Sequence, residues 1–278
     1  MDLTSIEAVE RPEGDAAIAA RMGCFGEGDA WLAGGTWLFS EPQPQLRRLI
    51  DLAAAGWPPI SADAEGLFIA ATCTIAELDR FEAPGTWQAS HLIGKCCRAF
   101  LASFKIWNVA TVGGNLCMSL PAGPMISLTT ALDGSCEILS RSGSSRKVPA
   151  VDFVHGPLEN ALEPGEILRG VYIPAASLMR PAAFRRISLS PMGRTGALVT
   201  GTRAPDGGFD LTVTGATRRP VRVAFSYAPA LTALRARIDV AIPPDLWHDD
   251  IHGRPEWRRH MVMQFAAEIV AELSEGAA

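Results

Sequence analysis

The sequence is poor in the residue patterns that build metal and disulfide sites. Its 278 residues include six cysteines and five histidines. No two cysteines form a Cys-x-x-Cys pair, none has a histidine at zinc-ligand spacing, and the spacing of plant-type iron–sulfur clusters is missing. The pattern predicts no metal site, and buried free thiols in a reducing compartment, at Cys24, Cys73, Cys96, Cys97, Cys117 and Cys136.

Long apolar runs and an excess of positive charge are also absent. Residues 1–11 contain acidic groups and no apolar core of signal-peptide length, and no stretch approaches the ~20 residues of a membrane span. The formal net charge is -5, which argues against sequence-independent affinity for nucleic acid. We therefore expect a cytoplasmic protein with no membrane span and no nucleic-acid partner.

Two glycine pairs, each at the end of an apolar run, stand out in what is present. One lies in Leu32-Ala33-Gly34-Gly35-Thr36-Trp37 and the other in Ala110-Thr111-Val112-Gly113-Gly114-Asn115-Leu116. Gly-Gly lets successive backbone N–H groups turn toward one point. Two such concavities together could hold a diphosphate, with Thr and Asn side chains adding hydrogen bonds. One isolated pair more simply makes a turn after a strand, so the interpretation depends on both.

Local signals predict several elements. Thr74 and Glu77 fit a capping box, and Ser90 is placed to cap a helix that runs to about Phe104. Residues 105–120 show no clear period and predict an extended, buried loop system. Trp257, Met261, Phe265 and Ile269 share one face of a C-terminal helix that begins at Pro255. Arg258-Arg259 is most simply a solvated or interface charge pair, and Asp249-Asp250 with His252 caps the approach to that helix.

At four ordered places the sequence resembles the FAD-binding, medium subunit of the molybdenum hydroxylases, which include carbon monoxide dehydrogenase, xanthine dehydrogenase and aldehyde oxidoreductases. The matching segments are AGGT at 33–36, ATVGGNL at 110–116, PGEIL at 164–168 and DDIHGRPEWRRH at 249–260. The resemblance implies an α+β fold with a two-lobed FAD domain of the vanillyl-alcohol-oxidase/PCMH type at 1–175. Its small lobe would cover 1–56 and its larger lobe 57–175. Residues 176–278 would form a three-stranded antiparallel sheet with helices.

The resemblance also implies a cofactor site. Both glycine motifs would bind the FAD diphosphate through backbone amides, which is not the Rossmann solution because no GxGxxG follows a strand. Leu168 would pack against the flavin end, and Arg185 falls where the family often has a lysine near the ring. The implied contacts are Leu32, Ala33, Gly34, Gly35, Thr36, Trp37, Ala110, Thr111, Gly113, Gly114, Asn115, Leu168 and Arg185.

Three departures from the family pattern concern the adenosine contacts or a flavin face. Trp37 stands where relatives often have a small polar residue, Trp107 where arginine is common, and Ala122-Gly123-Pro124 where Ala-Ala-Asp is usual. Trp37 would either shield a face of the flavin or belong to the core.

The resemblance implies an oxidoreductase subunit that transfers electrons and has no catalytic acid or base of its own. A large partner would carry the molybdenum cofactor and a small partner two 2Fe-2S clusters, in a doubled heterotrimer. FAD would collect electrons from the clusters and pass them to an external acceptor. Two other readings stay open: a self-sufficient FAD-dependent oxidase or reductase of the same fold, and a non-catalytic assembly subunit. The sequence identifies neither the substrate nor the acceptor.

Overall fold

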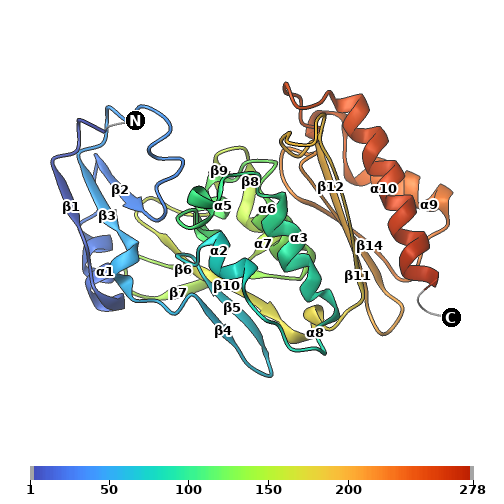
Figure 1. Ribbon diagram of the computed structural model, residues 1–278, viewed down its shortest axis with the longest axis horizontal. Coiled ribbons are helices and arrows are strands. Elements are labelled where there is room, and N and C mark those ends of the chain that lie inside the picture. The colour runs from blue at the N-terminus through green and yellow to red at the C-terminus, as the bar shows by residue number, and fades with distance from the viewer. Residues whose placement is uncertain (1–2, 276–278) are drawn as a thin grey trace.

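The computed structural model describes residues 3–275, which form a small N-terminal lobe, a larger lobe and a C-terminal sheet in a row (Figure 1). The small lobe is a parallel three-stranded sheet of order β1-β3-β2 with one helix. Its elements are β1 (Ala8–Glu10), α1 (Gly14–Gly23), β2 (Asp29–Leu32), β3 (Arg48–Asp51) and the 3-10 turn η1 (Leu52–Ala55). Arg48 lies opposite Asp29 in register and donates to its carboxylate through Nε and Nη2, each at 2.8 Å, so the strand before the first glycine pair is tied to β3.

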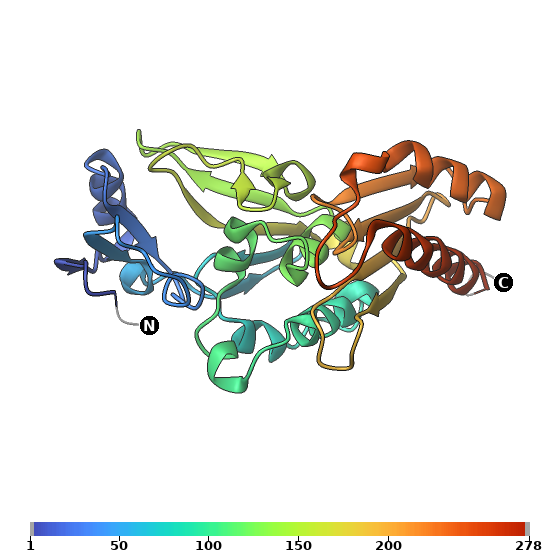
Figure 2. The ribbon, with the colours of Figure 1, turned by 90° about the horizontal axis from the view of Figure 1, so that it is seen from above.

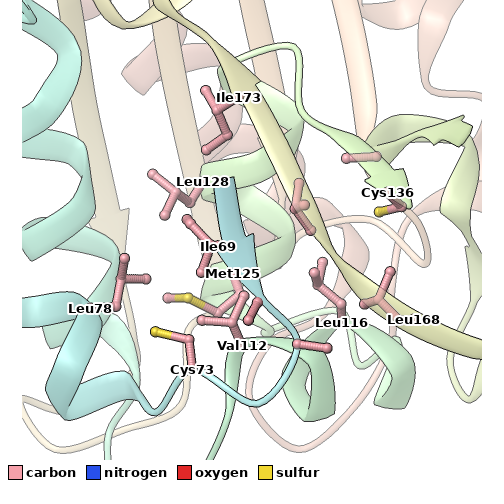
Figure 3. Packing of buried hydrophobic residues seen from close by; sticks show 14 of the residues in the cluster. Ile69, Cys73, Leu78, Val112, Leu116, Met125, Leu128, Cys136, Leu168 and Ile173 are labelled. Carbon is pink, nitrogen blue, oxygen red and sulfur yellow. The ribbon is translucent and has the colours of Figure 1, made fainter. Parts of the chain in front are cut away.

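The larger lobe is an antiparallel sheet of order β4-β5-β10-β6-β7 with helices against it (Figure 2). The strands are β4 (Ile60–Ala62), β5 (Gly66–Ala70), β6 (Ser135–Leu139), β7 (Ser145–Pro149) and β10 (Ile167–Pro174). The helices are α2 (Ile75–Asp79), η2 (Gln88–Ser90), α3 (His91–Ala99), α4 (Phe104–Trp107), α5 (Val112–Met118), α6 (Pro124–Ala131), α7 (Ala150–Phe153) and α8 (Ala175–Leu178). A short hairpin, β8 (Val154–Gly156) and β9 (Glu159–Asn160), completes it. Apolar side chains from β5, α5, α6 and β10 fill the space between sheet and helices (Figure 3).

The C-terminal part is a sheet of four antiparallel strands, β11 (Ala182–Ile187), β12 (Ala197–Arg203), β13 (Phe209–Thr214) and β14 (Val221–Phe225). After these strands in the sequence come α9 (Leu231–Ala241), η3 (Pro244–Leu246) and α10 (Pro255–Glu275). The predicted α+β class is confirmed, but the sheet has one strand more than predicted. The extra strand is β14, in which buried Val221 and Val223 alternate with the more exposed Arg222 and Ala224.

The chain has two hydrophobic cores: buried residues up to Leu178 form the first, and buried residues from Ala183 onward form the second. Polar contacts join the two parts of the chain that these cores stabilise. Asp133, just after α6, accepts from Ser177 Oγ at 2.7 Å and Arg180 Nη1 at 2.9 Å, and forms an ion pair with Arg222. Helix α6 packs against β12 and β13 as well as against α3 and α5, and all eight of its residues are buried. The larger lobe and the C-terminal sheet therefore share one helix.

Several local predictions can be compared with this structure. The capping box is confirmed, since Thr74 Oγ1 accepts from the Glu77 amide at 3.1 Å and Glu77 Oε2 accepts from the Thr74 amide at 2.8 Å. The helix predicted to run from Ser90 to Phe104 is shorter, because α3 ends at Ala99 and Ser90 makes no capping bond. The extended loop predicted over 105–120 is wrong, since α4 and α5 both form there.

The cysteine prediction holds for most thiols. Burial raises the pKa of the Cys73 and Cys117 thiols to about 12, which keeps them protonated and unreactive. Cys24 is exposed, so the prediction of a buried thiol is wrong there. From Leu3 to Glu275, no helix is both long and apolar enough to cross a bilayer.

Arg258 is buried, with 1% of its surface exposed, so the prediction of a solvated pair is wrong for this residue. Its Nε donates to the Gly253 carbonyl at 2.8 Å and its Nη1 to the Gly196 carbonyl at 2.6 Å, while Asp250 forms an ion pair with Nη2. One guanidinium thus joins the start of α10 to the loop before β12. Arg259, the next residue, forms an exposed ion pair with Asp239 at 2.8 Å.

We expect replacement of Arg258 by glutamine to lower the free energy of unfolding by about 3–5 kcal/mol, because it leaves the buried carbonyls of Gly253 and Gly196 without their donor and breaks the ion pair with Asp250. Arg259→Gln, one residue away, is the matched control and should cost ~1 kcal/mol or less. Urea unfolding of both variants measures the difference, and equal losses would contradict the assignment.

Candidate functional site

The structure brings the two glycine motifs together. A Cβ built on Gly34 would overlap the carbonyl of Val109 and lie 3.1 Å from the Cα of Ala110. Only glycine allows this backbone-to-backbone approach of the small and larger lobes. The first motif follows β2, and the second follows α4 and enters α5. Sequence segments about 75 residues apart therefore form one cradle, as the pairing of the motifs predicts.

The first motif leaves its backbone donors free. Within residues 3–275, the amides of Gly34, Gly35, Thr36 and Trp37 donate no hydrogen bond. The carbonyl of Gly35 instead accepts from the Phe39 amide at 2.9 Å, which closes a turn. Gly35 has φ +68°, a conformation that favours glycine. Four consecutive free donors at one turn fit an anionic group such as a diphosphate.

The second motif uses its donors inside the protein. The amide of Val112 donates to the Cys73 carbonyl at 2.8 Å and that of Gly113 to the Ala71 carbonyl at 2.9 Å. The Gly114 amide donates to Thr111 Oγ1 at 3.0 Å, as the side-chain cap of α5. At the second motif the amides of Val112, Gly113 and Gly114 are therefore already bonded within the protein, and binding of FAD through this motif stays a prediction.

The second pair of glycines still has a clear steric role. A Cβ on Gly113 would meet the backbone of Ala71 at 2.7 Å, so this glycine lets α5 approach the end of β5. A Cβ on Gly114 would meet only Thr111 Oγ1, at 3.0 Å, so its outer side is open. Asn115 Oδ1 accepts from the Met125 amide at 3.0 Å and holds the start of α6. These contacts shape the wall of the cradle, and contact of these residues with a cofactor stays a prediction.

Exposed apolar side chains flank the cradle. Val109, whose carbonyl faces Gly34, is 45% exposed, and Phe104 in α4 is 74% exposed. On the first motif Trp37 is 37% exposed, so it does not belong to the core. Trp107 is partly buried and donates from Nε1 to the Phe100 carbonyl at 3.0 Å, which ties α4 to the end of α3. An apolar surface beside free amides suits a ligand with an aromatic part and an anionic part.

The other two predicted contacts lie in different surroundings. Leu168 in β10 is 3% exposed and packs in the first core (Figure 3). Arg185 in β11 donates to Glu268 at 2.8 Å and to Glu272 at 2.7 Å, both on α10. These carboxylates raise the pKa of the guanidinium and occupy it. Flavin contact by Leu168 and Arg185 stays a prediction, and the structure gives each side chain another role.

Two further arginines were missed by the sequence analysis. In β11, Ala182 and Phe184 pack against the first core while Ala183 and Ile187 pack against the second. Strand alternation therefore places Arg186 on the face toward the larger lobe and Arg185 on the opposite face. Arg186 donates to Thr195 Oγ1 at 2.7 Å and the Gly193 carbonyl at 2.8 Å, with no carboxylate partner among the described residues. Only the register of β11 reveals which face of the sheet Arg186 occupies.

The second missed arginine is Arg169, which joins the two lobes. Its guanidinium lies over the ring of Trp57 at 4.2 Å and 5.5 Å from that of Phe68, and Trp57 Nε1 donates to Asp15 at 2.6 Å. Asp15 belongs to α1 of the small lobe, Trp57 to the segment between η1 and β4 that joins the lobes, and Phe68 and Arg169 to the sheet of the larger lobe. This stack holds the small and larger lobes together, and the cradle lies where their two loops meet. Among residues 3–275, no group of three or more His, Cys, Asp or Glu side chains is placed to hold a metal ion.

Comparison with known proteins gives a consistent result. Residues 15–176 match the family model described as the FAD binding domain in molybdopterin dehydrogenase. Xanthine dehydrogenase of Oryza sativa subsp. japonica is 33% identical over 117 residues, which are 40% of this chain and 8% of that enzyme. The caffeine dehydrogenase subunit beta of Pseudomonas sp. (strain CBB1) is 33% identical over 88 residues, which are 32% of this chain and 30% of that subunit. The chain thus spans much less than two thirds of the curated relatives it matches.

Two solved structures share the fold over the full chain. One, from the CO dehydrogenase of Oligotropha carboxidovorans, has a TM-score of 0.83, with 22% identity and 98% of each chain covered. The other, from quinoline 2-oxidoreductase of Pseudomonas putida 86, has a TM-score of 0.81 and 19% identity, and covers 100% of this chain and 99% of that one. The predicted family resemblance, fold and FAD cofactor are confirmed.

We expect Gly34→Ala to reduce the FAD that copurifies with the chain by about tenfold or more, because its Cβ would force the two loops apart. Gly85→Ala is the matched control, since nothing lies within 4 Å of a Cβ there. The flavin absorbance per chain measures the outcome. Full flavin content in Gly34→Ala would show that the contact does not shape the site.

Proposed function

The chain belongs to the family of FAD-binding domains in molybdopterin dehydrogenases, and on that premise we propose that it is the electron-transfer subunit of a multi-subunit molybdenum hydroxylase. In this proposal a small partner with 2Fe-2S clusters delivers electrons, and a large partner with the molybdenum cofactor oxidises the substrate. An external acceptor removes the electrons. The assembly is a doubled heterotrimer in the cytoplasm.

The observation that carries the proposal is the meeting of the two glycine motifs. The free amides from Gly34 to Trp37 would hold the FAD diphosphate, while Gly114 leaves the opposite wall open. The exposed apolar side chains of Val109 and Trp37 would exclude water beside the cofactor. When bound, FAD supplies the redox chemistry, collecting electrons singly and passing them to the external acceptor. The chain itself contributes position and electrostatics.

No side chain of the cradle is arranged as an acid, base or nucleophile. In the second motif, Thr111 Oγ1 is used in capping α5 and Asn115 Oδ1 in holding the start of α6. This supports a subunit that passes electrons over a self-sufficient enzyme with its own organic substrate. The free amides of the first motif favour cofactor binding over a purely structural role.

The first test is the visible spectrum of the purified full chain, with the flavin then released by acid and identified by chromatography. We expect close to one FAD per chain. The loaded chain should then oxidise a reduced 2Fe-2S partner and show no turnover with organic substrates alone. Turnover by the isolated chain would favour the self-sufficient enzyme. A chain that stays colourless with FAD and its partners would indicate an assembly subunit.

We further propose that Arg186 supplies the positive charge near the flavin, because it faces the larger lobe and lacks a carboxylate partner among the described residues. Arg186→Gln should lower the two-electron flavin potential by about 30 mV or more, since a cation stabilises the anionic reduced form. Arg185→Gln is the neighbouring control and should change the potential less, because its charge is matched by α10. Redox titration of both variants decides between the two arginines. A larger shift in Arg185→Gln would instead favour Arg185, the position that the family resemblance implies.

A further inference from the structure

A groove of about 490 Å³ lies at the seam between the larger lobe and the C-terminal sheet. Its walls come from η2 and α8 on the first side of the seam, and from the end of β12 and the turn that follows it on the second. Its volume falls within the ~300–1,000 Å³ of small-molecule sites. None of its lining residues belongs to 32–37 or 110–116, so FAD binding does not account for it.

Most of the wall of this groove is apolar. It consists of Ala176, Met179, Pro181, Ala204 and Pro205. Alanine and proline lose no rotamer entropy when a ligand covers them, so contact with them costs little. Met179 is 46% exposed, and its flexible thioether side chain adapts to the shape that it covers. The groove therefore suits a ligand with an apolar body.

The charges of the groove are unbalanced, because two arginines and no carboxylate line it. Arg180 is matched from beneath, since its Nη1 lies 2.9 Å from Asp133 Oδ2 and 3.8 Å from Asp210 Oδ2. Arg203 has no carboxylate within ion-pair distance among residues 3–275. Its guanidinium donates to the carbonyl of Leu273 near the end of α10, at 3.3 Å, and a carbonyl carries only a partial charge. The groove thus holds one unmatched positive charge.

Arg203 also has donors to spare. The bond to Leu273 uses Nη1 and fixes the guanidinium, while Nε and Nη2 donate to no other described residue. Arg203 is half-buried and holds no buried nitrogen that lacks a partner, so these two nitrogens keep contact with solvent. Two N–H groups on a planar fork match the two oxygens of a carboxylate. The exposed side-chain amide of Gln88, in the same wall, offers a further donor.

We propose that this groove binds a small monocarboxylate with an apolar body, aromatic or short aliphatic. The carboxylate accepts from the guanidinium of Arg203 and the amide of Gln88, and the body lies against Met179 and the two prolines. Helix α8 contributes Leu178 to the first core and β12 contributes Val199 to the second, so the ligand joins both parts of the chain. This site goes beyond the proposed function and does not depend on FAD.

Phenylacetate, phenylacetamide and acetate, titrated into the full chain at constant ionic strength, test the chemistry of this site. We expect saturable binding of phenylacetate. Phenylacetamide, which lacks the charge, and acetate, which lacks the apolar body, should each bind about tenfold more weakly or less. In a chain labelled at the methionine methyl groups, the Met179 resonance should shift, while that of the buried Met22 in the small lobe should not. Absence of saturable phenylacetate binding, or equal affinity for the acid and its amide, would overturn the proposal.

Variants locate the binding. Arg203→Gln should weaken phenylacetate about tenfold and leave phenylacetamide unchanged, and Arg237→Gln on the exposed face of α9 is its matched control. Phenylacetate binding that is unchanged in Arg203→Gln would place the ligand elsewhere and contradict the proposal.

A second pair of variants tests the charge of the groove without touching Arg203. Ala176 is exposed in the first turn of α8, where a glutamate suits the helix dipole. Ala176→Glu should weaken phenylacetate several-fold more than Ala176→Gln, which has the same size and no charge. Equal affinities in these two variants would contradict recognition by charge. Flavin content should be the same in all four variants, which separates this result from the test of FAD binding.

Discussion

The close contact between the backbone of Gly34 and that of Val109 and Ala110 is the constraint on which the candidate site depends. A loop of the small lobe and the entry to α5 can meet there only because one of them has no side chain. The strand before Gly34 is held by the Asp29–Arg48 pair, and Ala110 accepts from the Ile75 amide at 2.9 Å. Each loop is thus held by contacts within its own lobe. The distance between the two loops is set by how the lobes pack against each other.

The two glycine pairs are alike in sequence and different in use. In the first, the backbone donors are free and the turn is closed through the carbonyl of Gly35. In the second, the donors bond to Ala71, Cys73 and Thr111, and the missing side chain of Gly113 serves packing. One pair therefore has backbone donors free for hydrogen bonding, while the other serves the packing of α5 against the end of β5.

Signals that act within a few residues were predictable from the sequence, as the Thr74–Glu77 capping box shows. The family, the α+β fold and the two glycine motifs were also predictable, since ordered motifs carry them. Helix α5 was missed because a Gly-Gly pair disfavours a helix, and contacts with Ala71 and Cys73 outweigh that preference. Burial of Arg258 depends on carbonyls about 40 to 60 residues away, and the opposite faces of Arg185 and Arg186 depend on which layer covers each side of β11. Local patterns do not contain this information.

Helix α6 has a consequence for how this chain can be divided. The matched family region ends at residue 176, but α6 within it is buried on one side by α3 and α5 and on the other by β12 and β13. A chain cut after α8 would uncover the apolar side of α6, leave Ser127 without Thr214, and separate Asp133 from Arg222. The region recognised by its sequence is therefore smaller than the unit that folds. Gene fission at that boundary would produce two pieces that need each other.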